Sequence, residues 1–488
     1  MNYVIAIDQS TSGTKALLVN SQGKIVHKAA CKHEQFYPQP SWVEHDPLEL
    51  YENVKYLLKE MPNQNIKAIS ITNQRETVVV WDQETGLPVY NAIVWQCRRT
   101  TPMCKTLIEQ GYEKWIQTKT GLTLDAYFSA TKVKWILDNV QGLKEKAIQG
   151  RLLMGTIDSW LIWKLTNGAV HATDYTNASR TLLFNIQTLT WDPELLDLFE
   201  IPVSMLPVVK SSNDKFGVIG DPQIESLLGT PISGVIGDSQ GALFGQKCFE
   251  KGMAKATYGT GTSVLMYTGK PINGRHGLVT SISWGINGHV YYALEGIIHS
   301  TGDTTNWLKD QLGLIHDMNE MEPLAKSLTH NQGVYLVPAF VGLGAPYWNS
   351  DARAAILGMN RNTGKAHIVR AALESTAYQV KDVIELLQQE SNIEIQQLKV
   401  DGGATENQFL MQFQADLLKV EVCVSEVMEL SAMGSAYLAG LGVGIWKSME
   451  EINQLNSENM PYFPTMTKKL RDEQYAGWKK AVSRVLIK

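Results

Sequence analysis

The first thirty residues alternate between short apolar runs and turn residues. Tyr3–Ile7, Lys15–Asn20 and Ile25–Ala30 are runs of strand length, separated by turns rich in Ser and Gly. Runs of this kind are typical of β-strands, and the short spacing between them is typical of hairpins. The chain is therefore predicted to open with three hairpin-joined strands.

A helix and a further strand are predicted next. Asp46 suits an N-cap and Pro47 suits the first helical position. Apolar residues then recur at helical spacing, at Leu50, Val54, Leu57 and Leu58. Residues 66–72 are again strand-like. The pattern thus predicts a β-meander that leads into alternating helices and strands.

The second half of the chain repeats this pattern in weaker form. A meander, a long helix and a strand are predicted in turn over residues 256–261, 263–267, 278–284, 290–293, 366–389 and 397–400. Two similar halves predict a duplicated α/β fold with a cleft between two lobes. We place the domain boundary between 1–247 and 248–488, because residues 245–251 separate an apolar segment from the next meander.

Composition and charge exclude several classes of protein. The chain has 488 residues, of which 44% are hydrophobic and 19% charged, so it is long enough for two folded domains and is not disordered. It carries 44 Lys and Arg against 49 Asp and Glu, without a block of like charge. A nucleic-acid partner is not expected, because such proteins usually show a basic stripe.

The cysteines and the apolar segments indicate in which cellular compartment the protein is expected. The five cysteines are scattered and form no CxxC pair, which argues against a disulfide framework and for a reducing environment. The N-terminus enters a strand without signal-peptide features. Leu430–Trp446 is apolar but interrupted by Gly and Ser, and it is shorter than the ~20 residues of a membrane-spanning helix. We expect a buried small-residue helix there and a cytoplasmic protein without membrane insertion.

Three turns are candidates for binding phosphates or a nucleotide. Residues 8–15, Asp-Gln-Ser-Thr-Ser-Gly-Thr-Lys, form a hydroxyl-rich hairpin whose backbone N–H groups can wrap a phosphate. Asp8 can hold Mg²⁺, and Lys15 can balance phosphoryl charge. Residues 257–262 occupy the equivalent place in the second half, and Gly402 and Gly403 permit close approach of a nucleotide. Taken alone, each turn can also be an ordinary turn without a ligand. No GxxxxGK[ST] loop is present.

Four further residues are candidates for acid–base chemistry or for binding a polyol. Asp238 ends an apolar run and can act as a general base, or it can merely cap a helix. Arg75 and Glu76 can bind vicinal hydroxyls, or they can form a solvated surface pair. Trp95 closes the apolar run 92–95 and can stack on the carbon face of a polyol, or it can belong to the core.

Taken together, these segments resemble the FGGY family of carbohydrate kinases, and within it the glycerol kinase branch. The resemblance covers residues 3 to about 446 and is carried by long motifs at residues 71–77, 90–99, 127–135, 173–180, 342–348 and 409–414. It implies an actin/hexokinase-like fold of two duplicated, ribonuclease H-like lobes that close on ATP and substrate. It also implies a homodimer.

The resemblance further implies a role for each matched residue. Asp238 is implied as the general base, and Asp8 together with Asp238 as the Mg²⁺ site. The implied polyol-binding residues are Arg75, Glu76, Trp95, Tyr127, Asp238, Ser239 and Ser263. The implied nucleotide-binding residues are Thr11, Ser12, Gly13, Lys15, Gly259, Thr260, Gly261, Gly302, Asn306, Gly403, Ala404 and Asn407.

The departures from the family pattern concern the acceptor. Ser239 stands where glycerol kinases usually carry Gln, and Ser263 stands where they usually carry Phe. Lys15 replaces an arginine, which keeps the charge and loses the bidentate fork. The implied reaction is ATP-dependent phosphorylation of glycerol to sn-glycerol 3-phosphate. The alternative is a kinase for a larger polyol or ketose of the erythritol, ribitol, xylulose or ribulose type.

Other proteins of this fold act as repressors, chaperones or filaments. A repressor would need an N-terminal helix-turn-helix, but the first predicted strand begins at Tyr3. A chaperone would need a substrate-binding domain beyond two lobes, for which 488 residues leave no room. A pseudokinase would lack Asp8 or Asp238, and both are present. The sequence therefore favours an active kinase.

Overall fold

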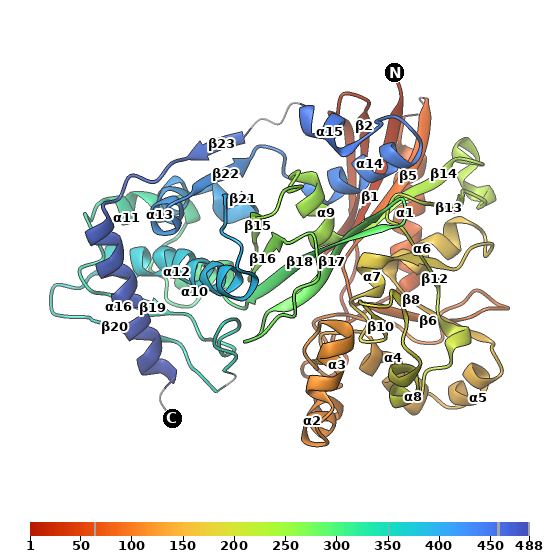
Figure 1. Ribbon diagram of the computed structural model, residues 1–488, viewed down its shortest axis with the longest axis horizontal. Coiled ribbons are helices and arrows are strands. Elements are labelled where there is room, and N and C mark those ends of the chain that lie inside the picture. Colours follow the sequence, from red (N-terminus) through yellow and green to blue (C-terminus); the bar gives the residue numbers. More distant parts are fainter. Residues whose placement is uncertain (63–64, 350, 456–458, 487–488) are drawn as a thin grey trace. The chain divides into compact units, whose positions relative to one another are not determined.

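The computed structural model describes residues 1–62, 65–349, 351–455 and 459–486 (Figure 1). The chain folds into two compact units. The first comprises Met1–Lys247, Thr280–Tyr292 and Glu429–Asn456, and the second comprises Cys248–Val279, Ala293–Met428 and Ser457–Lys488. Two segments from the second half of the sequence are thus built into the first unit.

A six-stranded mixed sheet forms the centre of the first unit, with the strand order β13-β14-β5-β1-β2-β3. β1 pairs in antiparallel fashion with β2 and in parallel with β5, and β5 pairs in parallel with β14. The strands are β1 (Tyr3–Gln9), β2 (Gly13–Asn20), β3 (Ile25–Lys32), β5 (Ile66–Asn73), β13 (Lys215–Val218) and β14 (Pro231–Gly237). The predicted opening meander and the strand over 66–72 are therefore confirmed.

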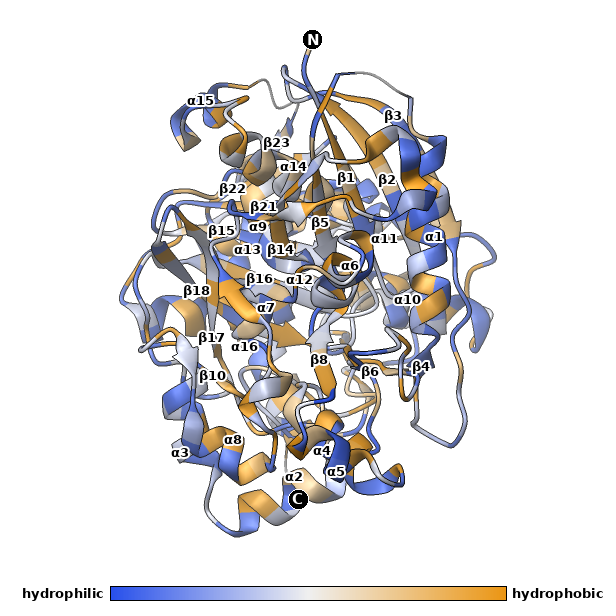
Figure 2. Ribbon diagram, turned by 90° about the vertical axis from the view of Figure 1, so that its right-hand side faces the viewer, coloured by the Kyte–Doolittle hydropathy of each residue, from blue (hydrophilic) through white to orange (hydrophobic). Residues whose placement is uncertain are grey.

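Helices α1 (Pro47–Glu60) and α6 (Ile157–Leu165) pack on one face of this sheet. Their apolar side chains form one core with Ile5 and Ile7 of β1 and Ile69 of β5. Asp46 is the N-cap of α1, since its side chain accepts from the backbone N–H of Leu48, as the sequence predicts. Figure 2 shows hydrophobic colouring along β1 and β2 and both colours on α1, as expected for a helix that buries one side.

Helices α9 (Asp238–Gly245) and α14 (Leu430–Gly442) pack together near the strands β1, β5 and β14. Small residues make this approach possible: a Cβ on Gly434 would lie 1.9 Å from the carbonyl oxygen of Gly241. Ser435 of α14 also hydrogen-bonds Ser70 of β5 at 2.9 Å. The predicted small-residue helix after Leu430 is therefore confirmed as a buried element.

A second, four-stranded sheet in this unit has the order β4-β7-β6-β8. Its strands are β4 (Glu44–His45), β6 (Val78–Asp82), β7 (Ala92–Ile93) and β8 (Leu152–Thr156). The short strands β9 (Ala172–Asp174), β10 (Phe184–Asn185), β11 (Thr190–Trp191) and β12 (Val208–Lys210) form two-stranded ladders. The remaining helices are α2 (Thr101–Glu109), α3 (Glu113–Thr120), α4 (Ala130–Asn139), α5 (Leu143–Ile148), α7 (Tyr175–Ala178), α8 (Pro193–Phe199) and α15 (Met449–Gln454).

The seven-stranded sheet β17-β18-β16-β15-β21-β22-β23 supplies the central strands of the second unit, although most of β17 and the start of β18 fall in the segment Thr280–Tyr292 of the first unit. Its strands are β15 (Met253–Tyr258), β16 (Thr262–Tyr267), β17 (Val279–Ile286), β18 (His289–Ile298), β21 (Gln397–Asp401), β22 (Glu421–Ser425) and β23 (Asn459–Tyr462). The helices are α10 (Gly302–Asp310), α11 (Met321–Lys326), α12 (Lys365–Ser391), α13 (Gln408–Leu418) and α16 (Lys468–Leu486). The short strands β19 (Tyr335–Val337) and β20 (Ala355–Leu357) pair with each other.

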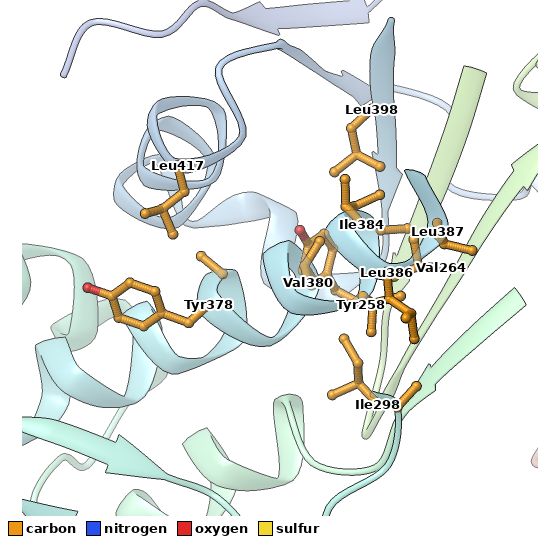
Figure 3. Packing of buried hydrophobic residues seen from close by; sticks show 14 of the residues in the cluster. Tyr258, Val264, Ile298, Tyr378, Val380, Ile384, Leu386, Leu387, Leu398 and Leu417 are labelled. Atoms are coloured by element: carbon orange, nitrogen blue, oxygen red, sulfur yellow. The ribbon is translucent and has the colours of Figure 1, made fainter. Parts of the chain in front are cut away.

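The core of the second unit lies between α12, α13 and the central strands. Figure 3 shows Ile384 of α12 near Leu398 of β21, and Tyr378 farther along the same helix. These side chains belong to one buried apolar cluster. The long helix predicted over 366–389 is confirmed as α12, and the strand predicted over 397–400 is confirmed as β21.

The two sheets share one arrangement of strands. β15 pairs in antiparallel fashion with β16 and in parallel with β21, and β21 pairs in parallel with β22. This is the pattern that β1 makes with β2 and β5, and that β5 makes with β14. The predicted duplication is therefore visible in strand order and direction. The carboxyl ends of parallel strands meet at one edge of a sheet, so each unit gathers its strand-end turns there.

Candidate functional site

Asp238 and Arg75 form an ion pair at the carboxyl edge of the first sheet. Asp238 follows β14 and Arg75 follows β5, and the Arg75 Nε lies 3.3 Å from the Asp238 Oδ1. The Arg75 side chain is 4% exposed, whereas that of Asp238 is 38% exposed. A buried guanidinium thus holds a carboxylate that stays accessible. The interpretation of Asp238 as a helix cap is wrong, because Gly237 is the N-cap of α9 and Asp238 lies inside the helix.

The backbone around Asp238 is held by two hydroxyl groups. Gly237 donates its N–H to the Thr176 Oγ1 at 2.8 Å, and the Ser431 hydroxyl donates to the Asp238 carbonyl at 2.9 Å. The Ser239 N–H donates to the Asp238 Oδ1 at 2.6 Å. The carboxylate is therefore oriented by α7, α14 and its own helix.

Glu76 adjoins this pair and is fully buried. Its Oε1 accepts from the Arg180 Nε at 2.5 Å and lies 3.8 Å from the Arg75 Nε. The Glu76 backbone has φ of 63°, in the left-handed region, which turns the chain sharply after β5. Arg75 and Glu76 are 5% and 1% exposed, so the interpretation as a solvated surface pair is wrong.

Two aromatic rings continue the site. The ring centroids of Trp95 and Tyr127 lie 5.3 Å apart, and the Arg180 guanidinium lies 5.9 Å from the Tyr127 ring centroid. Trp95 is half-buried, so it does not belong to the core. Of the apolar run 92–95, only Ala92 and Ile93 form a strand, and the Trp95 N–H donates to the Thr77 hydroxyl at 3.2 Å.

The turn from Asp8 to Lys15 is linked to these rings. The Trp95 Nε1 donates to the Thr11 Oγ1 at 2.9 Å, and the Ser10 N–H donates to the Gly13 carbonyl at 2.9 Å, which closes the hairpin. Thr11 and Gly13 are half-buried and Ser12 is exposed. The predicted phosphate turn and the predicted polyol residues of the first unit therefore form one contiguous group.

Lys15 is paired with an acidic residue from α14's N-terminal edge. Its Nζ lies 2.8 Å from the Glu429 Oε2, and Lys28 pairs with the other oxygen of Glu429. This pairing lowers the pKa of Glu429 against the opposing effect of burial. The two lysines and Glu429 together carry a net positive charge, which the neighbouring carboxylates Asp8 and Asp238 offset.

Asp8 has the donor chemistry of a partial metal site. Burial raises the pKa of Asp8 to about 7, Lys15 acts in the opposite direction, and the nearby charges of Asp238 and Glu429 raise it further. A divalent cation would relieve both the burial cost and the repulsion between Asp8 and Asp238. Within the described ranges no three acidic, His or Cys side chains converge on a metal position. The residues fit an ion that takes most of its ligands from water and phosphate, as Mg²⁺ does.

In the second unit, the predicted nucleotide residues come together at the end of β15. Gly302 donates its N–H to the Gly259 carbonyl at 3.0 Å, and a Cβ on Gly302 would lie 2.4 Å from that same oxygen. A Cβ on Gly402 would lie 2.2 Å from the Tyr258 carbonyl, at φ of +98°. Three backbone segments, which carry Gly259–Gly261, Gly302 and Gly403, therefore lie so close together that a side chain would not fit at the contact points.

The other predicted nucleotide residues lie on helices that start at this place. Asn306 is exposed one turn into α10, and Asn407 is the N-cap of α13, where its Oδ1 accepts from the Leu410 N–H. Ala404 follows Gly403 in the short helix Gly403–Glu406. Thr260 is exposed at the tip of the turn.

The two serines that depart from the family pattern belong to different units. Ser239 is in the first turn of α9, next to Asp238. Ser263 is on β16, and its hydroxyl donates to the Glu295 Oε1 of β18 at 3.1 Å. Glu295 is fully buried, so the Ser263 hydroxyl serves an internal carboxylate of the second unit.

The structure adds residues to which the sequence assigned no role. Arg180 holds Glu76, Gln240 accepts from the Arg75 Nη1 at 3.2 Å, and Glu429 holds Lys15. Arg180 closes one of the motifs that carry the family resemblance, so a signal was present. Glu429 lies 414 residues from Lys15 along the chain, and no local pattern could have linked them.

A duplicated α/β scaffold with strand-end carboxylates and glycine-rich turns has the groups that phosphoryl transfer needs. The chain belongs to the FGGY family of carbohydrate kinases: the family's N-terminal domain matches residues 3–245 and its C-terminal domain matches residues 254–443. Glycerol kinase 2 of Thermotoga maritima is 52% identical over 100% of this chain and 99% of that protein. A glycerol kinase of Caldanaerobacter subterraneus is 52% identical over 99% of this chain and 98% of that protein.

Solved structures agree with this assignment. The Plasmodium falciparum glycerol kinase with ADP superposes with a TM-score of 0.96 at 40% identity, covering 100% of this chain and 99% of that one. A xylulose kinase of Lactobacillus acidophilus shares the fold with a TM-score of 0.88 at 21% identity, covering 99% of each chain. The expected actin/hexokinase-like fold and the expected kinase class are therefore confirmed. No helix in the described part of the chain is both long and apolar enough to span a membrane.

Proposed function

We propose that this chain transfers the γ-phosphoryl group of ATP to a terminal hydroxyl of glycerol, giving sn-glycerol 3-phosphate. The observation that carries the proposal is the contiguous group of Arg75, Glu76, Trp95, Tyr127 and Asp238. It combines an accessible carboxylate with buried hydrogen-bonding charges and an aromatic wall. Relatives named glycerol kinase, about half identical over their full length, support the same acceptor.

Asp238 acts as the general base in this proposal. Its carboxylate accepts the proton of the attacking hydroxyl while that oxygen bonds to the γ-phosphorus and the bond to the β-phosphate oxygen breaks. Arg75 orients the carboxylate and donates to a second hydroxyl, and Glu76 accepts from a hydroxyl. Trp95 and Tyr127 cover the carbon face of the polyol, where apolar C–H groups need an apolar surface.

The nucleotide residues remain part of the proposal. The turns at Thr11–Gly13 and Gly259–Gly261 present backbone N–H groups to phosphates, with Lys15 as a compensating charge. Gly302, Asn306, Gly403, Ala404 and Asn407 lie along the nucleotide. Mg²⁺, held by Asp8 with Asp238 nearby, would neutralise charge on the transferring phosphoryl group.

Three further expectations belong to this proposal. We expect the domains to comprise residues 1–247 and 248–488. We also expect the protein to be a homodimer and to be located in the cytoplasm. Sedimentation of the purified protein tests the dimer, with a single species of twice the chain mass as the expected result. Limited proteolysis tests the division, with first cleavage expected near residues 245–251.

An acceptor panel tests the proposed function. The kcat/KM for ATP-dependent phosphorylation is compared across glycerol, dihydroxyacetone, erythritol, ribitol, xylulose and ribulose. Glycerol is expected to exceed every larger acceptor by about tenfold or more, since one methylene is worth ~1–3 kcal/mol of discrimination. A larger polyol or ketose as the best acceptor would overturn glycerol and favour the alternative that Ser239 and Ser263 suggest.

A further inference from the structure

Lys132, on α4, is fully buried and points its charge at a loop of the proposed polyol site. Its Nζ donates to three consecutive carbonyl oxygens, those of Ala126, Tyr127 and Phe128, at 2.7, 2.6 and 2.9 Å. An ammonium has three N–H donors, so this arrangement uses all of them. The three carbonyls surround Tyr127, which forms the aromatic wall with Trp95.

A second set of hydrogen bonds, through Asp125, holds the N-terminal side of the same loop. The Tyr127 N–H donates to the Asp125 Oδ1 at 2.8 Å. Asp125 in turn accepts two hydrogen bonds from Arg98, at 2.5 and 2.9 Å, in a bidentate pair. Arg98 lies three residues after Trp95, so this pair joins the two chain segments that carry the aromatic rings.

The charge of Lys132 is buried and is held by backbone acceptors. Burial lowers the pKa of Lys132 to about 7, while the nearby groups Glu76, Cys97, Asp125 and Cys104 act in the opposite direction. Charge-assisted bonds to the three carbonyls also favour the protonated form. An apolar side chain of similar length would avoid the burial cost of the charge, but it would leave the carbonyl oxygens of residues 126–128 without this donor. Lys132 therefore fixes the positions of these three carbonyl groups relative to α4.

We propose that Lys132 is a positioning residue that sets the place of Tyr127 against the polyol by gathering the carbonyls of residues 126–128. This inference rests on the proposed function of Tyr127 as a polyol contact. Lys132 touches neither substrate nor nucleotide in this proposal, and its effect passes through the loop.

The test compares Lys132→Gln and Lys132→Met with a matched control, Lys134→Met. Lys134 is on the same helix, but it pairs with Asp138 and Glu200 at 3.4 and 2.9 Å. The Lys132 variants are expected to raise the KM for glycerol about 10- to 10²-fold, because small misplacements of substrate contacts have effects of this size. The KM for ATP is expected to stay within about twofold, and Lys134→Met is expected to change neither value. Equal changes in both KM values, or none, would overturn the proposal.

A double-mutant cycle separates positioning from general loosening. Once Tyr127→Ala has removed the ring, Lys132→Gln should add little to the KM for glycerol, because the two changes act on one contact. Fully additive effects would contradict the proposal. The milder Lys132→Gln variant keeps two donors, so it is the informative one if Lys132→Met does not fold.

Hydrogen exchange separates failure of this inference from failure of the proposed function. Peptides that cover residues 125–129 are expected to exchange faster in Lys132→Gln than in wild type, with the central strands unchanged. If wild type does not phosphorylate glycerol, the proposed function fails and the exchange result alone decides on Lys132. Unchanged exchange over 125–129 would overturn the positioning role.

Discussion

At the scale of single residues, the site separates charges that are buried from one that is accessible. Arg75 and Glu76 are enclosed, whereas the Asp238 side chain is 38% exposed. Enclosed charges keep a fixed geometry, since each has a partner that would be costly to abandon. The accessible carboxylate is free to exchange a proton with a substrate hydroxyl, which is what a general base must do.

Replacing Asp238 with Asn is expected to remove the base and to leave the fold intact. The amide cannot take up the hydroxyl proton, so kcat should fall by about 10²–10⁴-fold. Thermal unfolding of the variant should stay close to that of wild type, because α9 is held by Thr176 and Ser431 through backbone atoms. Steady-state kinetics with saturating ATP and glycerol measure the effect. A variant with most of its kcat intact would show that Asp238 is not the base.

At the scale of elements, α9 and α14 depend on glycine for their contact. Gly241, Gly245 and Gly434 bring the two backbones so close that a methyl group has no room. This contact seats the first turn of α9, where Asp238 and Ser239 lie. Close helix packing therefore serves the site as well as the core.

Gly434→Ala should destabilise the protein and displace α9. The added Cβ would lie 1.9 Å from the Gly241 carbonyl oxygen, so the helices must move apart. Overpacking of this kind costs about 1–3 kcal/mol. Ser435→Ala, in the same helix, adds no volume and removes two hydrogen bonds, to Ser70 and to the Ala432 carbonyl, each worth about 1 kcal/mol. Urea unfolding measures both variants, and a Gly434→Ala variant as stable as wild type would contradict the packing argument.

The hydrogen-bond network around Asp158 makes the stability of the fold depend on pH. Burial raises the pKa of Asp158 to about 7, and the like charge of Asp174 adds to this effect. Asp158 accepts from the hydroxyls of Thr156 and Thr173 at 2.5 and 2.6 Å, which joins β8, α6 and β9. Since the folded protein binds this proton more tightly than the unfolded chain, stability falls as the pH rises from about 4 to about 7.

Asp158→Asn should remove that dependence. Relative to wild type, the variant is expected to gain up to about 1.4 kcal/mol of stability for each pH unit between about pH 4 and 7, and no more above it. Urea unfolding of both proteins at several pH values from 4.5 to 8 measures the difference. A difference that does not change with pH would show that Asp158 is ionised throughout.

At the scale of the whole molecule, the two units each supply one of the serines that set this chain apart. Ser239 belongs to the first unit and Ser263 to the second. Acceptor choice is therefore tested separately at position 239 of the first unit and at position 263 of the second. The Ser263 hydroxyl already pairs with Glu295, so a larger side chain at position 263 must also give up that bond.

The variant with Ser239→Gln and Ser263→Phe should narrow the acceptor range. Its kcat/KM for erythritol is expected to fall about tenfold or more relative to that for glycerol, because the phenyl ring fills the volume of an extra carbon. The single variants serve as controls for each unit. If the ratio is the same in wild type and the double variant, the two serines do not line the acceptor site.

Local patterns predicted the strands and helices of both sheets well, as β1, α1, α12 and β21 show. The family resemblance, and not local pattern, implied that Asp238 and Arg75 share one site, and the structure shows that both follow parallel neighbouring strands. Patterns could not foresee that Thr280–Tyr292 and Glu429–Asn456 join the first unit. Nor could local patterns foresee the contact of Arg180 with Glu76, which lie 104 residues apart in the chain.

The return of α14 to the first unit has a consequence for synthesis on the ribosome. The strand β14 is complete at residue 237, yet α14, which packs on it, ends at residue 442. At about 5–20 residues per second, roughly 10–40 s separate the two events. During that interval the sheet of the nascent first unit lacks α14. The apolar side chains that α14 covers in the folded protein are then exposed and can bind chaperones. Expression of residues 1–247 alone would leave this condition permanent.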